Sequence, residues 1–279
     1  MKRFLTFLLL SYIYIGAIYA YSPKDSIRIE QLLLKASKLK TSENKVLFFA
    51  REFLGTPYVA HTLDRNKTEQ LVINTAELDC TTYVENVMAL TLCATRGEKR
   101  FHDFCRQLQK LRYANGNVSY FSRLHYFTSW IEDNEHMGFV TKVQTNKVPF
   151  TAIQKLNIYY MSKNFKSYAM LRDYPKCPQE IIATEKSLTG RTYRYIPKGS
   201  IANTKLMRQT IHDGDIIAIL TNKKGLDTSH IGIAVWHKDG LHLLNASQIH
   251  KKVVEEPMTL RTYMQKHPSQ TGIRVCRLK

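Results

Sequence analysis

Residues 230–247 read HIGIAVWHKDGLHLLNAS, and this stretch decides the fold class. Apolar side chains alternate on both sides of Lys238-Asp239-Gly240, a tripeptide typical of a tight turn. The pattern therefore predicts an antiparallel hairpin whose strands cover residues 230–236 and 241–247. A further strand is predicted for residues 216–220, IIAIL, so the C-terminal third carries an antiparallel sheet.

The first half of the chain has helical patterns instead. Residues 45–54 carry apolar side chains at helical spacing, and Gly55 with Pro57 ends that pattern. Further helices are predicted from Asp79 and from about Glu98. Helices followed by an antiparallel sheet give an α+β fold. Periodicity is weaker from about 139 to 210, where we expect an inserted subdomain.

Composition restricts the class of protein. The 279 residues include 41 Lys and Arg against 23 Asp and Glu, giving a formal net charge of +18, and 44% are hydrophobic. These values exclude a disordered tail, a collagen-like rod and a coiled coil. The positive charge suits an anionic polymer, which leaves nucleic acid, a membrane surface or a cell wall as partners. Five cysteines are too few for a disulfide scaffold.

The sequence of the N-terminal segment indicates which of these partners to expect. Lys2 and Arg3 precede an apolar run that ends in small residues at Ala20, as in a secretory signal peptide. We therefore expect residues 1–20 to be a cleaved signal and 21–279 to be a periplasmic protein without a stable membrane anchor. The alternative is an uncleaved anchor, because the run nearly reaches membrane-spanning length. Export also makes nucleic acid an unexpected partner.

Cys80 is the strongest candidate nucleophile. It is predicted to lie in the first turn of a helix, directly after Asp79, an acceptable N-cap residue. Free backbone N–H groups and the helix dipole favour a thiolate there, whereas the Asp79 carboxylate opposes it. A partner imidazole is therefore required. The alternative is an inert buried cysteine, an interpretation that also fits Cys93 and Cys105.

The register of the hairpin indicates which histidine could be the imidazole partner of Cys80. If Trp236 faces Leu241, His230 shares one face of the sheet with Asn245. A Cys–His–Asn set needs an imidazole to accept the thiol proton and an amide oxygen to fix the tautomer of the ring. The alternatives are a structural histidine and an asparagine that binds its own backbone.

Metal chemistry is the main chemical rival. The sequence has no His-Glu-x-x-His, no Cys-x-x-Cys and no phosphate-binding Gly-x-x-x-x-Gly-Lys-Ser/Thr motif. We therefore expect no metal and no cofactor, with a zinc site built from scattered ligands as the alternative.

Taken together, these motifs resemble the ordered landmarks of NlpC-type cysteine amidases. The resemblance rests on Gly55-Thr56-Pro57-Tyr58, Leu78-Asp79-Cys80-Thr81-Thr82, Gly214-Asp215-Ile216-Ile217, Ser229-His230-Ile231-Gly232-Ile233 and Leu244-Asn245-Ala246. It implies a papain-like core, a peptidoglycan substrate, Cys80 as nucleophile, His230 as base and Asn245 as the residue that orients it. Tyr58, Asp79 and Thr81 would lie near the nucleophile, and Tyr58 would help to hold the reacting carbonyl.

Two departures narrow the expected specificity. Thr81-Thr82 replaces the usual Ser-Gly after Asp-Cys, and Ala60-His61 replaces the usual Gly pair. In the ordinary family these positions help to bind the free end of the stem peptide. Residues 78–85, 123–127 and 225–230 are instead similar to the branch of N-acetylmuramoyl-L-alanine amidases that act on anhydro-muropeptides. A γ-D-glutamyl–diaminopimelate endopeptidase and a non-catalytic wall-binding module stay open as alternatives.

Substrate contacts are expected from an aromatic and basic segment. Aromatic rings there could stack on sugars, while Arg123 and His125 offer hydrogen bonds. The alternative is that the aromatic rings are core, given the near-helical spacing of the last two of them. Asp227 and Ser229 belong to the segment before His230 that carries the resemblance, and they are also expected to contact the substrate. The aromatic group comprises Tyr113, Tyr120, Tyr126 and Trp130.

Overall fold

A computed structural model describes residues 19–279 of the chain. The signal peptide expected at residues 1–20 therefore lies outside the described residues, except for Tyr19–Ala20. These two residues form the short strand β1, which pairs in parallel with β2, Leu71–Val72. Among residues 19–279, no helix combines the length and apolar character that crossing a membrane requires.

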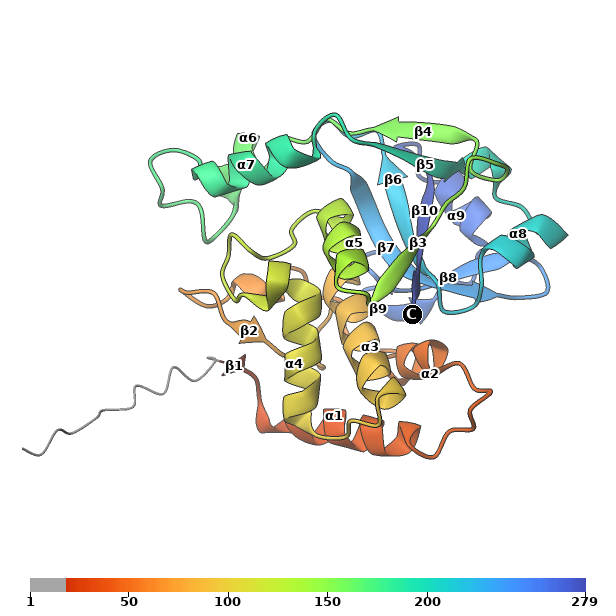
Figure 1. Cartoon of the computed structure of the whole chain (residues 1–279), viewed down its shortest axis with the longest axis horizontal. Helices are drawn as coiled ribbons and strands as arrows, with labels where there is room; N and C mark the ends of the chain where they lie inside the picture. The colour runs from red at the N-terminus through yellow and green to blue at the C-terminus, as the bar shows by residue number, and fades with distance from the viewer. Residues whose placement is uncertain (1–18) are drawn as a thin grey trace, which may run out of the picture.

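The helical half of the molecule is built around one buried helix, α3 (Cys80–Thr95). Every residue from 82 to 93 is buried, as expected of a helix with neighbours on all sides. Its neighbours are α1, α2 and α4 on the helical side and β7 and β8 on the sheet side (Figure 1). The other helices of this half are α1 (Pro23–Ala36), α2 (Lys45–Glu52), α4 (Phe101–Arg112) and α5 (Phe127–His136).

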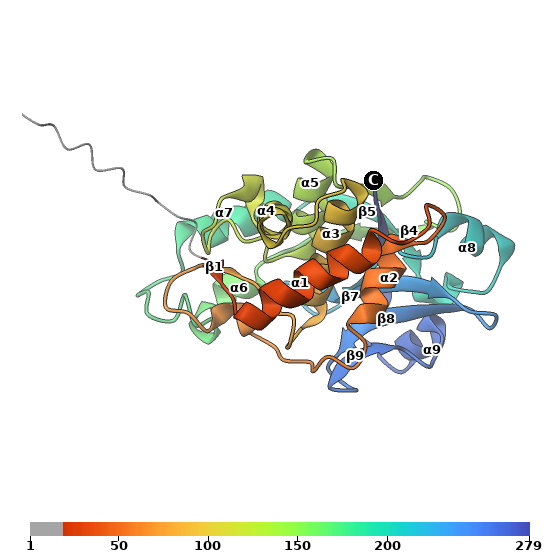
Figure 2. The same cartoon turned by 90° about the horizontal axis from the view of Figure 1, so that it is seen from below.

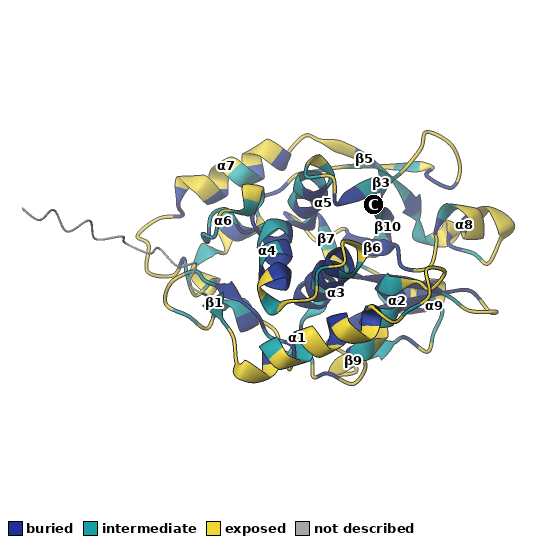
Figure 3. Ribbon diagram, turned by 60° about the horizontal axis from the view of Figure 1, so that its bottom comes forward, coloured by how far each residue is buried: buried dark blue, intermediate teal, exposed yellow. Residues whose placement is uncertain are grey.

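Side-chain caps decide where the important helices begin. Asp79 is the N-cap of α3, and its Oδ1 accepts a hydrogen bond of 2.8 Å from the backbone N–H of Thr82. In the same way, Asn44 is the N-cap of α2, and its Oδ1 accepts a hydrogen bond from the backbone N–H of Leu47. Figure 2 shows α1 crossing the outside of the helical layer, and Figure 3 shows its exposed outer side. The cap at Asp79 places Cys80 at the first helical position of α3.

The sheet is antiparallel, and its strands follow the order β4-β5-β10-β6-β7-β8-β9, with β3 also paired to β10. The predicted hairpin register is confirmed, because Trp236 pairs with Leu241 and Ile233 with Leu244. The strands are β3 (Val140–Val143), β4 (Ala152–Lys155), β5 (Thr192–Pro197), β6 (Ile216–Thr221), β7 (Thr228–Trp236), β8 (Leu241–Ser247), β9 (Lys252–Glu255) and β10 (Gln270–Leu278).

Each face of the sheet contributes to a different core. Ile216 and Ala218 belong to the core shared with the helices, whereas Ile217 and Ile219 belong to a second core on the other face. That second core is covered by α8 (Lys205–Thr210) and α9 (Leu260–Gln265). A strand buried on both faces explains the continuous apolar run of residues 216–220. The α+β class predicted from the sequence agrees with this arrangement.

The segment 139–210, where we expected an inserted subdomain, is only partly separate. Its strands β3, β4 and β5 pair within the main sheet. Between β4 and β5, however, α6 (Tyr160–Lys163) and α7 (Gln179–Leu188) share a small core of their own and lie at the periphery (Figure 1).

Gly232 in β7 permits the close packing of the hairpin. A Cβ added there would lie 2.7 Å from Leu243 Cγ and 2.9 Å from the Leu244 carbonyl oxygen. We expect Gly232→Ala to lower the free energy of unfolding by about 1–3 kcal/mol, because β8 must shift to accept the methyl group. Urea denaturation measures the change, and Gly199→Ala is the control, since nothing lies within 4 Å of its added Cβ. Equal midpoints for the two variants would contradict this packing.

Candidate active site

Cys80 lies where two cavities meet. It is half-buried at the start of α3. The larger cavity has a volume of about 410 Å³, and Tyr58, Asp79 and Thr81 also line it. The smaller cavity, of about 160 Å³, is shared with His230. The thiol is thus accessible from space large enough for part of a substrate.

His230 and Asn245 come from the paired strands β7 and β8 and form a hydrogen bond. His230 Nε2 lies 2.9 Å from Asn245 Oδ1. Asn245 Nδ2 donates to the Leu243 carbonyl oxygen at 3.2 Å, which fixes the amide with its oxygen toward the ring. Because an amide oxygen only accepts, Nε2 is the donor, and His230 keeps a lone pair on Nδ1. This is the tautomer that a general base requires.

The smaller cavity brings Cys80 and His230 into one site. It is also lined by Thr81, His125 and Ser229. The backbone of Ile231, the residue after His230, hydrogen-bonds to the Cys80 sulfur. Within residues 19–279, no hydrogen bond joins the sulfur to the His230 ring itself. The structure thus places Cys80 and His230 at one cavity, while the buried Asn245 joins the site through its hydrogen bond to the imidazole.

Burial and local charge set the protonation of the resting site. Burial first and the Asp79 carboxylate second raise the pKa of the Cys80 thiol to about 12, against the opposing hydrogen bonds from Ile231 and Thr81. Burial lowers the pKa of His230 below its ordinary 6.5, although the bond to Asn245 opposes this change. At neutral pH the pair is therefore a thiol and a neutral imidazole, so deprotonation of Cys80 depends on His230.

Tyr58 lies in the wall of the larger cavity, on the segment that enters the site before α3. Its backbone N–H donates to the Lys251 carbonyl oxygen at 2.9 Å, which ties this segment to the end of the sheet. Burial, followed by the charges of Cys80 and Asp79, raises the pKa of Tyr58 to about 12. Its hydroxyl group therefore stays protonated and can donate a hydrogen bond.

Arg123 and His125 also line the larger cavity, and both have protein partners. Arg123 Nη2 donates to Asp64 Oδ1 at 2.6 Å, and the guanidinium lies 4.7 Å from the centre of the Tyr120 ring. His125 Nε2 donates to the Tyr120 carbonyl oxygen at 2.7 Å. Burial lowers the pKa of His125 to about 3, so this ring is neutral. Both residues are held in place at the wall.

Three of the expected substrate contacts are buried away from the two cavities at Cys80. Trp130 is fully buried and stacks on Phe127 at 4.9 Å, and Tyr126 is 3% exposed, so their near-helical spacing marks core. Asp227 is 2% exposed, and its carboxylate accepts hydrogen bonds from the backbone N–H groups of Thr128 and Thr228. It therefore connects the start of α5 to β7.

The other aromatic candidates are buried as well. Tyr113 is fully buried and Tyr120 is 7% exposed, so neither presents a ring face for stacking on a sugar. By contrast, Ser229 is exposed and lines the smaller cavity.

Sequence reasoning missed several residues of the larger cavity. Asp64 ends a three-residue 3-10 helix and Gln248 lies in a turn, and no periodic pattern could predict the position of either residue. Glu85 and Arg112 also reach this cavity and form a buried ion pair of 2.6 Å. Glu85 follows Cys80 by five residues, and a buried carboxylate in an apolar helix was the available signal.

The carboxylates around the larger cavity already have partners. Asp79 caps α3, Glu85 pairs with Arg112, and Asp64 pairs with Arg123. Glycosidases need two carboxyl groups free to act on opposite sides of a sugar bond. This arrangement therefore favours chemistry at the thiol.

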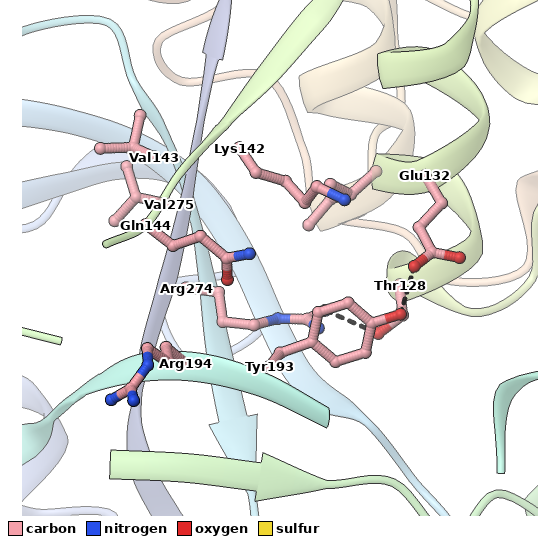
Figure 4. Close-up of a pocket in the computed structure, with 10 residues that line it drawn as sticks. Thr128, Glu132, Lys142, Val143, Gln144, Tyr193, Arg194, Arg274 and Val275 are labelled. Carbon is pink, nitrogen blue, oxygen red and sulfur yellow. Dashed lines mark hydrogen bonds between the residues drawn. The ribbon is translucent and has the colours of Figure 1, made fainter. Parts of the chain in front are cut away.

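A third and much smaller cavity lies between α5 and the strands β3, β5 and β10 (Figure 4). Its volume is about 10 Å³, barely room for one water molecule. Arg274 Nη2 donates to Thr128 Oγ1 at 2.6 Å, and Tyr193 hydrogen-bonds to Glu132. These contacts fill the space, so this cavity has a structural role.

Comparison with known proteins agrees with the geometry. A family model described as AmiA-like, N-acetylmuramoyl-L-alanine amidase-like, matches residues 48–273. A solved N-acetylmuramoyl-L-alanine amidase from Bacteroides uniformis ATCC 8492 is 38% identical, with a TM-score of 0.78 over 84% of this chain and 99% of that one. A comparison with curated proteins found no match.

Two further solved structures are similar. A Bacteroides fragilis protein, whose name suggests a xylanase, is 40% identical, with a TM-score of 0.76 over 82% of this chain and 98% of its own. A Legionella pneumophila protein is 22% identical, with a TM-score of 0.66 over 91% of this chain and 94% of its own, and shows likeness of fold alone.

Proposed function

The chain belongs to the AmiA-like family of N-acetylmuramoyl-L-alanine amidase-like proteins, and from this premise we propose that it is a cysteine-dependent amidase. The bond cleaved joins the lactyl group of muramic acid to L-Ala, and the substrates are anhydro-muropeptides. One observation carries the proposal: an accessible thiol at a helix N-terminus shares a cavity with an imidazole whose tautomer is fixed by an asparagine. The core is of the papain-like, NlpC type.

Attack by the sulfur is the first chemical step. His230 Nδ1 takes the proton of Cys80 as the sulfur bonds to the lactyl carbonyl carbon, and the carbonyl electron pair moves to oxygen. The backbone N–H groups at the start of α3 and the Tyr58 hydroxyl group donate to this oxyanion. The raised pKa of Cys80 makes this coupled proton transfer necessary.

Collapse of the intermediate completes the reaction. The carbon–nitrogen bond breaks, His230 gives its proton to the departing L-Ala amine, and a thioester remains on Cys80. Water then attacks the thioester with His230 as base, which releases the lactyl carboxylic acid and restores the thiol. The reaction needs no metal ion or cofactor.

The larger cavity receives the rest of the substrate. Its volume of about 410 Å³ is within the range of small-molecule sites. Thr81, Arg123 and His125 line this cavity, and Ser229 lines the smaller cavity that contains the thiol and His230. Removal of Lys2 and Arg3 with the signal peptide lowers the formal net charge from +18 to +16, and this positive charge attracts the carboxylates of muropeptides.

Location follows from the sequence pattern of residues 1–20 alone. The proposal treats them as a signal peptide, so that residues 21–279 act in the periplasm without a stable membrane anchor. Muropeptides are found there, and nucleic acid is not a partner.

Product analysis tests the reaction. A defined anhydro-muropeptide is incubated with the protein and the products are identified by mass spectrometry. The proposal expects a free anhydro-disaccharide and a peptide that begins with L-Ala. A disaccharide that retains L-Ala-D-Glu would instead show a γ-D-glutamyl–diaminopimelate endopeptidase, and unchanged substrate would favour a non-catalytic wall-binding module.

Replacing His230 and replacing Asn245 should lower kcat to different extents, and activity should depend on the protonation of His230. We expect His230→Ala to reduce kcat by about 10⁴-fold or more and Asn245→Ala to reduce it by a smaller factor, because Asn245 only orients the base. Activity requires the neutral ring, so it is present above the pKa of His230 and lost as pH falls through it.

The direction of the pH shift in the Asn245 variant can be predicted. The bond to Asn245 raises the pKa of His230, so the acid limb of the kcat/KM profile should lie at lower pH in Asn245→Ala than in the unmodified protein. Steady-state rates over a pH series measure the limb. A limb that stays in place or moves to higher pH would remove Asn245 from this role.

A further inference from the structure

The tip of the β7–β8 hairpin gathers three side chains that the amidase mechanism does not use. His237 follows the last residue of β7, Asp239 lies in the turn and His242 is the second residue of β8. Each residue offers one ligand atom, and these atoms all lie within 4.8 Å of one another. The centroids of the two rings lie 4.3 Å apart, and the ring planes are tilted by 45°.

Both ring nitrogens of His242 lie against oxygen atoms. Nδ1 donates to the Glu256 carbonyl oxygen at 2.8 Å, because that oxygen can only accept. Nε2 lies 3.0 Å from Asp239 Oδ1, which belongs to the same cluster. Nε2 is therefore the ring nitrogen that is turned toward the place where a metal ion would contact both side chains.

Each of the two rings also contacts an oxygen atom outside the cluster, as the rings of metal-binding histidines usually do. His242 is held by the Glu256 carbonyl group, and its side chain is only 5% exposed. His237 Nε2 lies 2.5 Å from Glu255 Oε1. Contacts of this kind fix the orientation of the ring toward a metal. The turn itself is closed by the His237 N–H, which donates to the Gly240 carbonyl oxygen at 2.9 Å.

We propose that His237, Asp239 and His242 form a binding site for one divalent transition-metal ion of the Zn²⁺ type. Two imidazoles and one carboxylate are ligands that Zn²⁺ accepts, with water in the fourth position. Mg²⁺ and Ca²⁺ prefer sets made of oxygen atoms alone. The Asp239 side chain is 63% exposed, so it is free to adjust to the ion, and the ion can enter from solvent.

The role of this site is structural. Its ligands join the two strands across the turn, while His230 and Asn245 lie toward the other end of the same hairpin. Seven residues of extended strand separate His230 from His237, a distance of about 23 Å. The bound ion therefore stabilises the hairpin without touching the reacting thiol.

Calorimetric titration tests the site directly. The full chain without any histidine tag carries Cys80→Ser, because the other four cysteines are buried and this change removes the one accessible thiol ligand. Titration with ZnCl₂ should show one ion bound per chain. His237→Gln and, separately, Asp239→Asn should each weaken Kd by about tenfold or more; both alter exposed side chains, so the fold is kept.

The matched control is His212→Gln, which removes an exposed histidine outside the cluster and should leave Kd unchanged. In the protein with Cys80 intact, EDTA should lower the melting temperature and leave turnover unchanged. The proposal is overturned if Zn²⁺ shows no saturable micromolar binding. It is equally overturned if His237→Gln binds as tightly as the control. These readouts do not depend on amidase activity.

Discussion

We expect Cys80→Ala to abolish amide hydrolysis and to leave the fold intact. In the proposed mechanism the sulfur forms the covalent bond to the substrate, and loss of a catalytic nucleophile typically costs about 10⁶-fold in kcat. The fold does not depend on this side chain, because α3 is started by the Asp79 cap and buried through residues 82–93. Hydrolysis rates on a defined muropeptide and the thermal melting curve measure the two halves of the prediction.

Cys93→Ala is the matched control. Cys93 lies on the same helix, is fully buried and belongs to the core. This variant should keep kcat and lose some stability, the reverse of Cys80→Ala. Retained turnover in Cys80→Ala, at a rate near that of Cys93→Ala, would end the assignment of the nucleophile.

We expect Arg112→Met to lower the free energy of unfolding by about 3–5 kcal/mol. Arg112 Nε lies 2.6 Å from Glu85 Oε2, and both side chains are almost completely buried. Arg112 Nη1 also donates to the Val72 carbonyl oxygen at 2.6 Å, next to the edge of the larger cavity. Removing the guanidinium leaves a buried carboxylate without its charge partner. Urea denaturation monitored by circular dichroism measures the loss.

Two companion variants make this result specific. Lys35→Met removes one partner of the Lys35–Glu52 pair, whose lysine side chain is 59% exposed, and should change stability by less than about 1 kcal/mol. Adding Glu85→Leu to Arg112→Met should recover part of the lost stability, because the uncompensated charge is gone. If Arg112→Met behaves like Lys35→Met, the buried pair does not stabilise the protein as described.

The sequence was most informative where local physics decides the structure. The alternation in residues 230–247 and the turn at residues 238–240 predicted the register that brings His230 to Asn245. Asp79 before an apolar helix likewise predicted the position of Cys80, because capping is a local interaction.

The sequence was least informative where distant segments meet. Trp130 and Asp227 share a neighbourhood with candidate site residues in sequence, but tertiary packing alone decides that one enters the core and the other binds backbone. The strands of segment 139–210 are short. In β4 no residue is fully buried, because half-buried and exposed residues alternate, so the apolar pattern of this strand did not indicate its place in the main sheet.

Trapping of the acyl-enzyme tests the central claim most directly. The protein is mixed with a defined anhydro-muropeptide, quenched rapidly in acid, and its intact mass and peptide map are measured. The account predicts an adduct with the mass of the anhydro-muramyl sugar portion, free of amino acids, on the peptide that contains Cys80. An adduct that carries L-Ala and D-Glu, or one attached to any other residue, would contradict it.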